Sequence, residues 1–193
     1  PYHGFSVEFS NHREYKPEDE IKHIDWKLWG RTDKYFIKEY EEETNLRTYI
    51  LMDKSMSMNY QSESYISKLE YAKVIAASLS YLMIKQKDAV GITTFDSKID
   101  NKTANKSTKS HLKDILHLLE KVTPNQDTNI SKILHQYAEK INQRGLIILI
   151  SDLLDEPKEI INGLNHFRYL GHEVLVIHIL DKNEMMLNIN NKT

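Results

Sequence analysis

The stretch Thr48-Tyr49-Ile50-Leu51-Met52-Asp53-Lys54-Ser55-Met56-Ser57 decides the fold of this chain. Its apolar first half predicts a buried strand over residues 46–52, and one carboxylate and two hydroxyls follow it directly. Apolar residues over 66–85 then recur at steps of three and four, which predicts a long amphipathic helix. The sequence therefore predicts a strand, a polar turn and a helix in succession, with side-chain oxygens concentrated in the turn.

The alternation of strand and helix continues to the end of the chain. Further strands are predicted at 89–95, 98–100, 146–150 and 174–179. Further helices are predicted around Leu112 to Leu119, from Asn129 to a stop at Gly145, and from Pro157 to a stop at Gly171. The strand at 146–150 is apolar without alternation, as in a strand covered by helices on both faces. Because such crossovers are right-handed, we predict an α/β fold with a doubly wound, mostly parallel sheet.

Residues 1–45 follow a different pattern, being irregular, charged and aromatic. Short strands are predicted at 5–9 and 34–43, and Trp26 and Trp29 are expected to be packing residues. We therefore predict a small β-rich N-terminal extension over 1–45, a main domain over 46–187 and a polar tail over 188–193.

The composition excludes several classes of function. The chain has 193 residues, no cysteine and a net charge of −2. Disulfides, zinc–thiolate sites and cysteine nucleophiles are excluded, and the charge gives no reason to expect nucleic acid or an anionic membrane as partner. No Gly-rich phosphate loop is present, so ATP hydrolysis by this chain is not expected. We expect a cytoplasmic protein, with any membrane anchor in sequence outside this segment.

The polar residues at the predicted strand ends suggest a metal site. Ligands of doubly wound sheets bind at the carboxyl ends of the strands, where the strand order reverses. If the strand from Leu146 lies beside the strand from Leu46, Asp53 and Asp152 form the tips of adjacent strands. Hard divalent cations prefer such oxygens. We predict a site for Mg²⁺, with Mn²⁺ or Ca²⁺ as alternatives, formed by Asp53, Ser55, Ser57, Thr128 and Asp152.

A structural explanation exists for each of these residues alone. Asp53, Ser55 and Ser57 can shape a turn and cap the following helix, and Asp127 or Thr128 can be the N-cap of the helix from Asn129. Asp152 can be a solvated strand end. The three segments together favour the metal site.

The same residues resemble a known binding motif. Asp53-Lys54-Ser55-Met56-Ser57, Asp127-Thr128-Asn129-Ile130 and Ile150-Ser151-Asp152 resemble the metal-ion-dependent adhesion site of von Willebrand factor type A domains. The N-terminal part is similar to bacterial domain-of-unknown-function family fifty-eight, in residues 4–9, 13–19, 24–27 and 37–39. One departure is Glu18, where that family usually has glycine.

The resemblance implies a type A domain that binds partners and is not an enzyme. It implies action with a MoxR-class AAA ATPase in chaperone-like maturation or assembly of other complexes, and a partner that supplies an acidic side chain to the metal. A rival hypothesis is a magnesium-dependent phosphohydrolase with Asp53 as nucleophile. Haloacid-dehalogenase-like phosphatases carry their acid–base carboxylate two residues later, where this chain has Ser55. A third hypothesis is a scaffold with a vestigial metal site.

Overall fold

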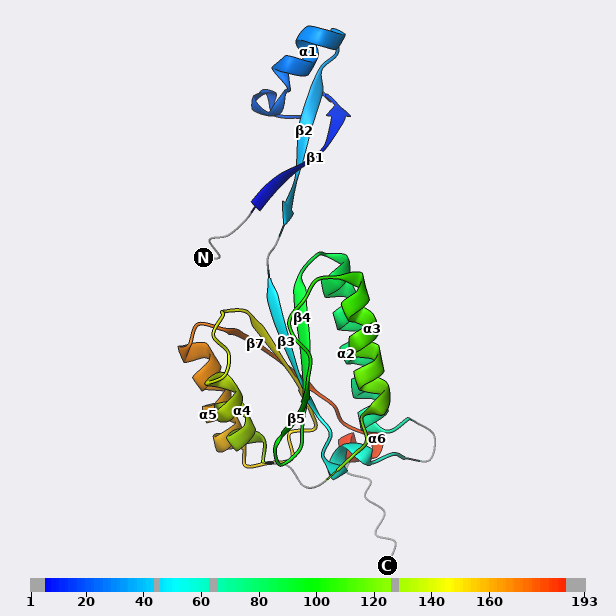
Figure 1. The fold of residues 1–193 in the computed structure, drawn as a ribbon, viewed down its shortest axis with the longest axis vertical. Helices are drawn as coiled ribbons and strands as arrows, with labels where there is room; N and C mark the ends of the chain where they lie inside the picture. The colour runs from blue at the N-terminus through cyan, green and yellow to red at the C-terminus, as the bar shows by residue number, and fades with distance from the viewer. Residues whose placement is uncertain (1–5, 44–45, 63–65, 126–128, 187–193) are drawn as a thin grey trace, which may run out of the picture. The chain divides into compact units, whose positions relative to one another are not determined.

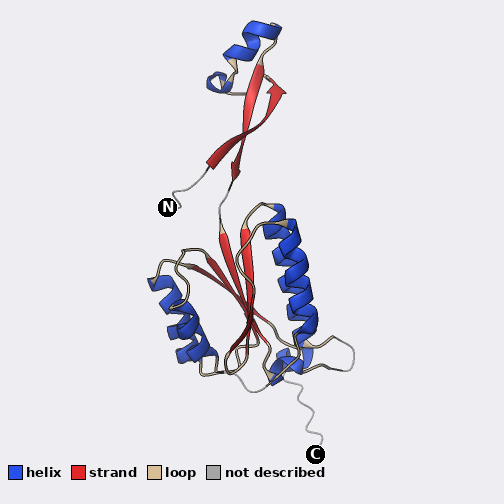
Figure 2. Cartoon of the chain, viewed as in Figure 1, coloured by secondary structure: helices blue, strands red, loops and turns tan. Residues whose placement is uncertain are grey.

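The computed structural model describes residues 6–43, 46–62, 66–125 and 129–186. The chain divides into two compact units, Pro1–Asn45 and Leu46–Thr193. Figure 1 labels most of the helices and strands of both units, and Figure 2 colours them by type.

The second unit contains a five-stranded sheet with the order β5-β4-β3-β6-β7. β3 pairs in parallel with β4 on one side and β6 on the other, β6 pairs in parallel with β7, and β5 is antiparallel to β4. The strands are β3 (Arg47–Asp53), β4 (Ala89–Phe95), β5 (Ile99–Lys102), β6 (Leu146–Ser151) and β7 (Glu173–His178). The strand order reverses between β3 and β6, which confirms the predicted doubly wound, mostly parallel sheet.

Helices cover both faces of this sheet (Figure 1). One face carries α2 (Lys68–Lys85) and α3 (Lys109–Lys121), and the other carries α4 (Ile130–Ala138) and α5 (Pro157–Tyr169). A short 3-10 helix, η2 (Met56–Asn59), follows β3, and α6 (Lys182–Met185) follows β7. Among the described residues, none of the helices combines the length and apolar composition that crossing a bilayer requires.

Two details of the helices differ from the prediction. α4 was predicted to run to Gly145 but ends at Ala138, and the segment that follows, with its buried Ile141, lies outside the helix. Ile141 fits the helical period without belonging to the helix, because it reaches the same apolar cluster from the turn. α6 was not predicted, since four residues are too few for a periodic pattern.

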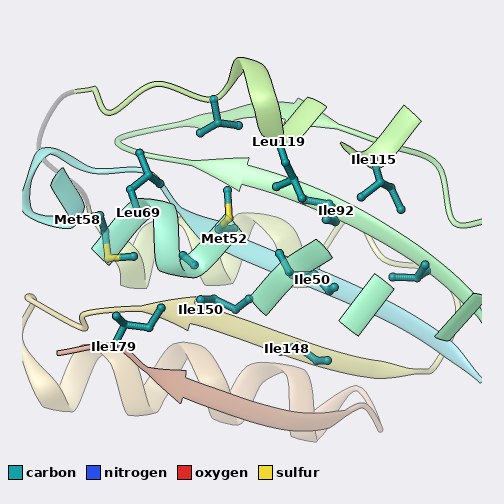
Figure 3. Packing of buried hydrophobic residues seen from close by; sticks show 14 of the residues in the cluster. Ile50, Met52, Met58, Leu69, Ile92, Ile115, Leu119, Ile148, Ile150 and Ile179 are labelled. Atoms are coloured by element: carbon teal, nitrogen blue, oxygen red, sulfur yellow. The ribbon is translucent and has the colours of Figure 1, made fainter. Parts of the chain in front are cut away.

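The alternation of β3 divides the core into two clusters. Ile50 and Met52 face the cluster formed with α2 and α3, which Figure 3 shows with Leu69 among the contributing side chains. Tyr49 and Leu51 face the cluster formed with α4 and α5. β3 is thus the central strand of the sheet and is buried on both faces. The residues that follow β3 therefore leave the sheet at the centre of the domain.

The first unit is an antiparallel pair of strands with two short helices in the connection. It consists of β1 (Ser6–Glu14), the 3-10 helix η1 (Ile21–His23), α1 (Trp26–Thr32) and β2 (Phe36–Glu43). The Arg13 guanidinium donates two hydrogen bonds to the Asp19 carboxylate, at 2.8 and 3.0 Å, and holds the pKa of Asp19 down at about 2. Asp25 caps α1 by accepting hydrogen bonds from the N–H groups of Lys27 and Leu28. These acidic residues therefore have local structural roles.

Trp26 and Trp29, which were expected to be packing residues, pack on each other and on Tyr35 within the first unit but remain partly exposed there. Trp26 is 55% exposed and Trp29 is 37% exposed. α1 is a single short helix with no buried residue among those described, so its two indoles contact each other edge to face, and Trp29 stacks on Tyr35.

We expect Ile50→Ala to lower the free energy of unfolding by about 2–5 kcal/mol, because Ile50 is fully buried in the central strand and its truncation leaves a cavity. Leu116→Ala is the control: Leu116 lies on α3 and is 44% exposed, so its truncation should cost about 0.5 kcal/mol or less. Urea denaturation of both variants measures the difference. Equal losses would contradict the assignment of the core.

Candidate metal centre

Asp53 and Asp152 lie at the carboxyl ends of adjacent strands. β3 and β6 pair in parallel with Met52 opposite Ile150, so the chain leaves both strands at the same edge of the sheet. Asp53 is 0% exposed and Asp152 is 1% exposed. The fold thus brings two buried carboxylates to the place where ligands of doubly wound sheets bind.

The Asp53 carboxylate is fixed by its own turn and by the neighbouring strand. Its Oδ1 accepts a hydrogen bond of 2.8 Å from the Ser55 N–H, and its Oδ2 accepts one of 2.7 Å from the Ser151 hydroxyl. Burial raises the pKa of Asp53, and the negative charge of Asp152 raises it further, although the hydrogen bonds oppose this shift. A cation at this edge would offset the cost of ionising the carboxyl.

The hydroxyls of Ser55 and Ser57 point toward each other. Their Oγ atoms are 3.0 Å apart, on the turn that leads into η2. Mg²⁺ prefers octahedral coordination with bonds of about 2.0–2.1 Å, which places adjacent ligand oxygens about 2.9 Å apart. The spacing of the two hydroxyls therefore fits two neighbouring positions around such an ion.

The two carboxylate oxygens of Asp152 differ in their hydrogen bonding. Its Oδ2 accepts a hydrogen bond of 2.8 Å from the Lys68 ammonium, whereas its buried Oδ1 has no partner among the described residues. A buried oxygen without a partner costs free energy and calls for an explanation. The next residue, Leu153, has a φ of 56°, which is unusual for leucine and is a strain of the kind that gathers at functional sites. Both observations fit an oxygen reserved for a ligand.

Thr128, the fifth predicted ligand, lies outside the described residues together with Asp127. Asn125 and Asn129 on either side are described. The Asn125 N–H donates to the carbonyl oxygen of Lys54 at 3.0 Å, so Asn125 is anchored to the turn that carries Ser55. Asn129 caps α4 by accepting from the Lys132 N–H, the capping role that the alternative interpretation gave to Asp127 or Thr128.

Two lysines are buried although the sequence pattern did not predict their burial. Lys54 pairs with Asp96 at 2.8 Å and Asp100 at 3.2 Å, and Lys68 pairs with Asp152 at 2.8 Å and Glu184 at 2.7 Å. For Lys68 a signal existed, because it precedes Ala72 by one helical turn and so lies on the buried stripe of α2. No comparable signal marked Lys54.

The candidate centre depends on hydroxyl oxygens as well as carboxylates. Within the part of the chain that the structure describes, no three His, Asp or Glu side chains come together as metal ligands. Asp53, Asp152 and the two serines are therefore a mixed oxygen set, suited to Mg²⁺ and not to the softer transition metals.

The raised pKa of Asp53 predicts a pH effect in metal-free protein. The folded state holds the proton more tightly than the unfolded state, whose pKa is near 3.8, so this group lowers stability as the pH rises through its folded pKa. Other carboxyls make the free energy of unfolding rise with pH. The effect of Asp53 is therefore measured as the difference between the wild type and Asp53→Asn. The free energy of unfolding in EDTA should fall with pH more in the wild type than in Asp53→Asn. Parallel curves would show that the Asp53 carboxyl is not destabilised by burial.

Comparisons with known proteins support the fold. The uncharacterized protein Rv1480 of Mycobacterium tuberculosis is 22% identical over 181 residues, covering 91% of this chain and 55% of the relative. This chain thus spans about half the length of the curated relatives it matches. An aerotolerance-related membrane protein from Bacteroides fragilis, solved with multiple mutations to serines, aligns with a TM-score of 0.58 and 22% identity, covering 69% of this chain and 67% of that chain. BatB from Bacteroides thetaiotaomicron aligns with a TM-score of 0.58 and 23% identity, covering 69% and 66%.

The match to a family model extends over both units. Residues 11–190 match the model described as "Protein of unknown function DUF58". That range includes most of the N-terminal segments and all the candidate metal residues on which the resemblance rests. The chain therefore belongs to the DUF58 family.

Proposed function

We propose that this protein is a divalent-metal-dependent module for protein–protein interaction. Asp53, Ser55, Ser57, Thr128 and Asp152 would hold the ion, for which Mg²⁺ is the first choice and Mn²⁺ or Ca²⁺ the alternatives. The observation that carries the proposal is the buried Oδ1 of Asp152, an oxygen without a partner among the described residues. It lies at the same edge of the sheet as the paired hydroxyls of Ser55 and Ser57.

The chemistry of this ligand set favours recognition of an anion. Serine and threonine hydroxyls are neutral ligands, and Asp53 already accepts a hydrogen bond at each of its oxygens. An ion held mainly by neutral oxygens keeps much of its positive charge and attracts a negatively charged ligand from outside. The proposed ligand is a carboxylate side chain of a partner protein.

Exposed apolar residues beside the centre support a protein as the partner. Met56 stands between the two serines and is 56% exposed, and Leu154 follows Asp152 by two residues and is 60% exposed. A cavity of about 360 Å³ at the same end of the sheet is lined by the charged residues Lys68, Asp181 and Lys182 and by apolar side chains, among them Ile66 and Met185. Exposed apolar surface bordered by polar residues marks protein–protein interaction sites.

We propose a MoxR-class AAA ATPase as the functional partner, in chaperone-like maturation or assembly of other protein complexes. Support for this partner comes from membership of the DUF58 family and from the resemblance of its motifs. The sequence has no Gly-rich phosphate loop of its own, so ATP hydrolysis would come from the partner.

We propose no catalytic role for Asp53. A nucleophile must reach its substrate, whereas Asp53 is 0% exposed and both of its oxygens accept hydrogen bonds. The position two residues later is a serine hydroxyl, which is a poor acid or base at neutral pH. Both observations favour a binding role over the phosphohydrolase alternative.

Calorimetric titration of Mg²⁺ into metal-stripped protein should show one saturable site. Asp53→Ala and Asp152→Ala should each weaken that binding at least about tenfold, because each removes a carboxylate from the centre. Asp114→Ala is the control, since Asp114 lies on α3 with its side chain 70% exposed and should bind Mg²⁺ as the wild type does. Equal binding by all three variants would place the ion elsewhere.

Retention of a purified MoxR-class ATPase on immobilised protein tests the partner. We expect retention in Mg²⁺ that is lost in EDTA and in Asp152→Ala, and kept in Asp114→Ala. Retention that is indifferent to EDTA and to Asp152→Ala would contradict a metal-dependent contact.

A further inference from the structure

A buried ammonium lies directly against the candidate metal centre. Lys68 is the first residue of α2 and is 2% exposed. Its Nζ donates hydrogen bonds of 2.8 Å to Asp152 Oδ2 and 2.7 Å to Glu184 Oε1, and it lies 5.8 Å from the centre of the Tyr60 ring. Lysine is rarely buried unless it is paired, so the two carboxylates account for its position.

The geometry divides the Asp152 carboxylate between two cations. Lys68 takes Oδ2, and Oδ1 is the oxygen that has no partner among the described residues. An ion that binds Oδ1 would therefore share one carboxylate with the ammonium. Like charges that share a carboxylate repel each other, and the repulsion is strong where burial reduces screening by water.

We propose that Lys68 is an internal counter-cation of the metal centre: it neutralises Asp152 in the metal-free protein and weakens the binding of the ion. This inference rests on the proposed function and assigns Lys68 as the residue that sets the affinity for the metal. Lys68 touches a ligand of the centre and not the ion, so its role is one of charge and positioning.

The balance of charge gives this arrangement a consequence for partner binding. Asp53 and Asp152 contribute two negative charges to the centre, and Lys68 contributes one positive charge. Addition of a divalent ion gives these groups a net charge of about +1, which a partner's carboxylate would neutralise. Glu184 also pairs with Lys68 and offsets part of its positive charge. The Glu184 side chain is 26% exposed, so water screens the charge of Glu184 more than that of Asp152. Metal and acidic partner should therefore bind more tightly together than either alone.

The competing explanation is that Lys68 only ties α2 to α6 through its two ion pairs. That role predicts a loss of stability in Lys68→Met that is the same with and without Mg²⁺. The counter-cation predicts a loss in EDTA, where Asp152 is left buried and unpaired, that Mg²⁺ reverses. The two explanations therefore differ in the effect of metal on stability.

The experiment measures Mg²⁺ affinity by calorimetry and thermal unfolding in EDTA or Mg²⁺, on the full chain. Lys68→Met should bind Mg²⁺ at least about fivefold more tightly than the wild type, and its unfolding temperature should rise more on adding Mg²⁺. Lys73→Met is the matched control: Lys73 lies on the same helix and pairs with Glu70, away from the centre, so both measurements should equal those of the wild type.

Glu184→Gln gives an effect of the opposite sign. The amide oxygen can still accept the hydrogen bond from the Asp181 N–H that caps α6, but the charge that shares Lys68 is lost. The Lys68 ammonium then has Asp152 as its only charged partner among these two, so its positive charge opposes the ion more strongly. Mg²⁺ binding should therefore weaken about twofold or more. This variant still allows the proposal to be contradicted if Lys68→Met does not fold.

The outcomes separate this inference from the proposed function. Wild-type binding of Mg²⁺ with unchanged or weaker binding in Lys68→Met would overturn the role of Lys68 and leave the metal centre standing. Stronger binding in Glu184→Gln than in the wild type would overturn it as well. Absence of Mg²⁺ binding in the wild type and in Lys68→Met would overturn both.

Discussion

Two carboxylates buried at the tips of adjacent parallel strands are the constraint on which this edge of the structure depends. Burying ionised carboxylates costs free energy unless each is paired or hydrogen-bonded. Ser151 and the backbone of the following turn satisfy Asp53, and Lys68 satisfies half of Asp152. The remaining oxygen of Asp152 has no partner among the described residues, so those residues do not compensate for its burial.

The position of Lys68 shows that this compensation outweighs local preferences. A cation in the first turn of a helix opposes the helix dipole, and the N-terminal turn is the place where anions are preferred. Lys68 nevertheless begins α2, directly after the capping residue Ser67. Its two carboxylate partners come from the ends of β6 and of the chain's last described helix, 84 and 116 residues away. The contact therefore ties three distant segments to one edge of the sheet.

The sequence predicts most of the fold because local patterns determine it. The apolar runs of β3 and β6 and the stripe of α2 each reflect burial of a continuous segment, and the structure confirms them. Local patterns predict helix boundaries poorly where a buried residue lies outside a helix. Ile141 is such a residue, because it is buried beyond the end of α4. Local patterns also say nothing of pairing between distant side chains. The aspartates and serines of the centre could be named from spacing, but the partner of Asp152 required the fold.

The site can carry unfavourable electrostatics because the stability of the domain lies elsewhere. Two apolar clusters, one on each face of the sheet, bury the middle of β3 and the helices that cover it, whereas the candidate centre lies where the strands end. The positive φ of Leu153 and the unpartnered oxygen of Asp152 are local costs that such a core can sustain. A metal ion and a partner's carboxylate would remove the electrostatic part of that cost. Binding free energy at this edge would then come from giving the buried oxygen of Asp152 a partner.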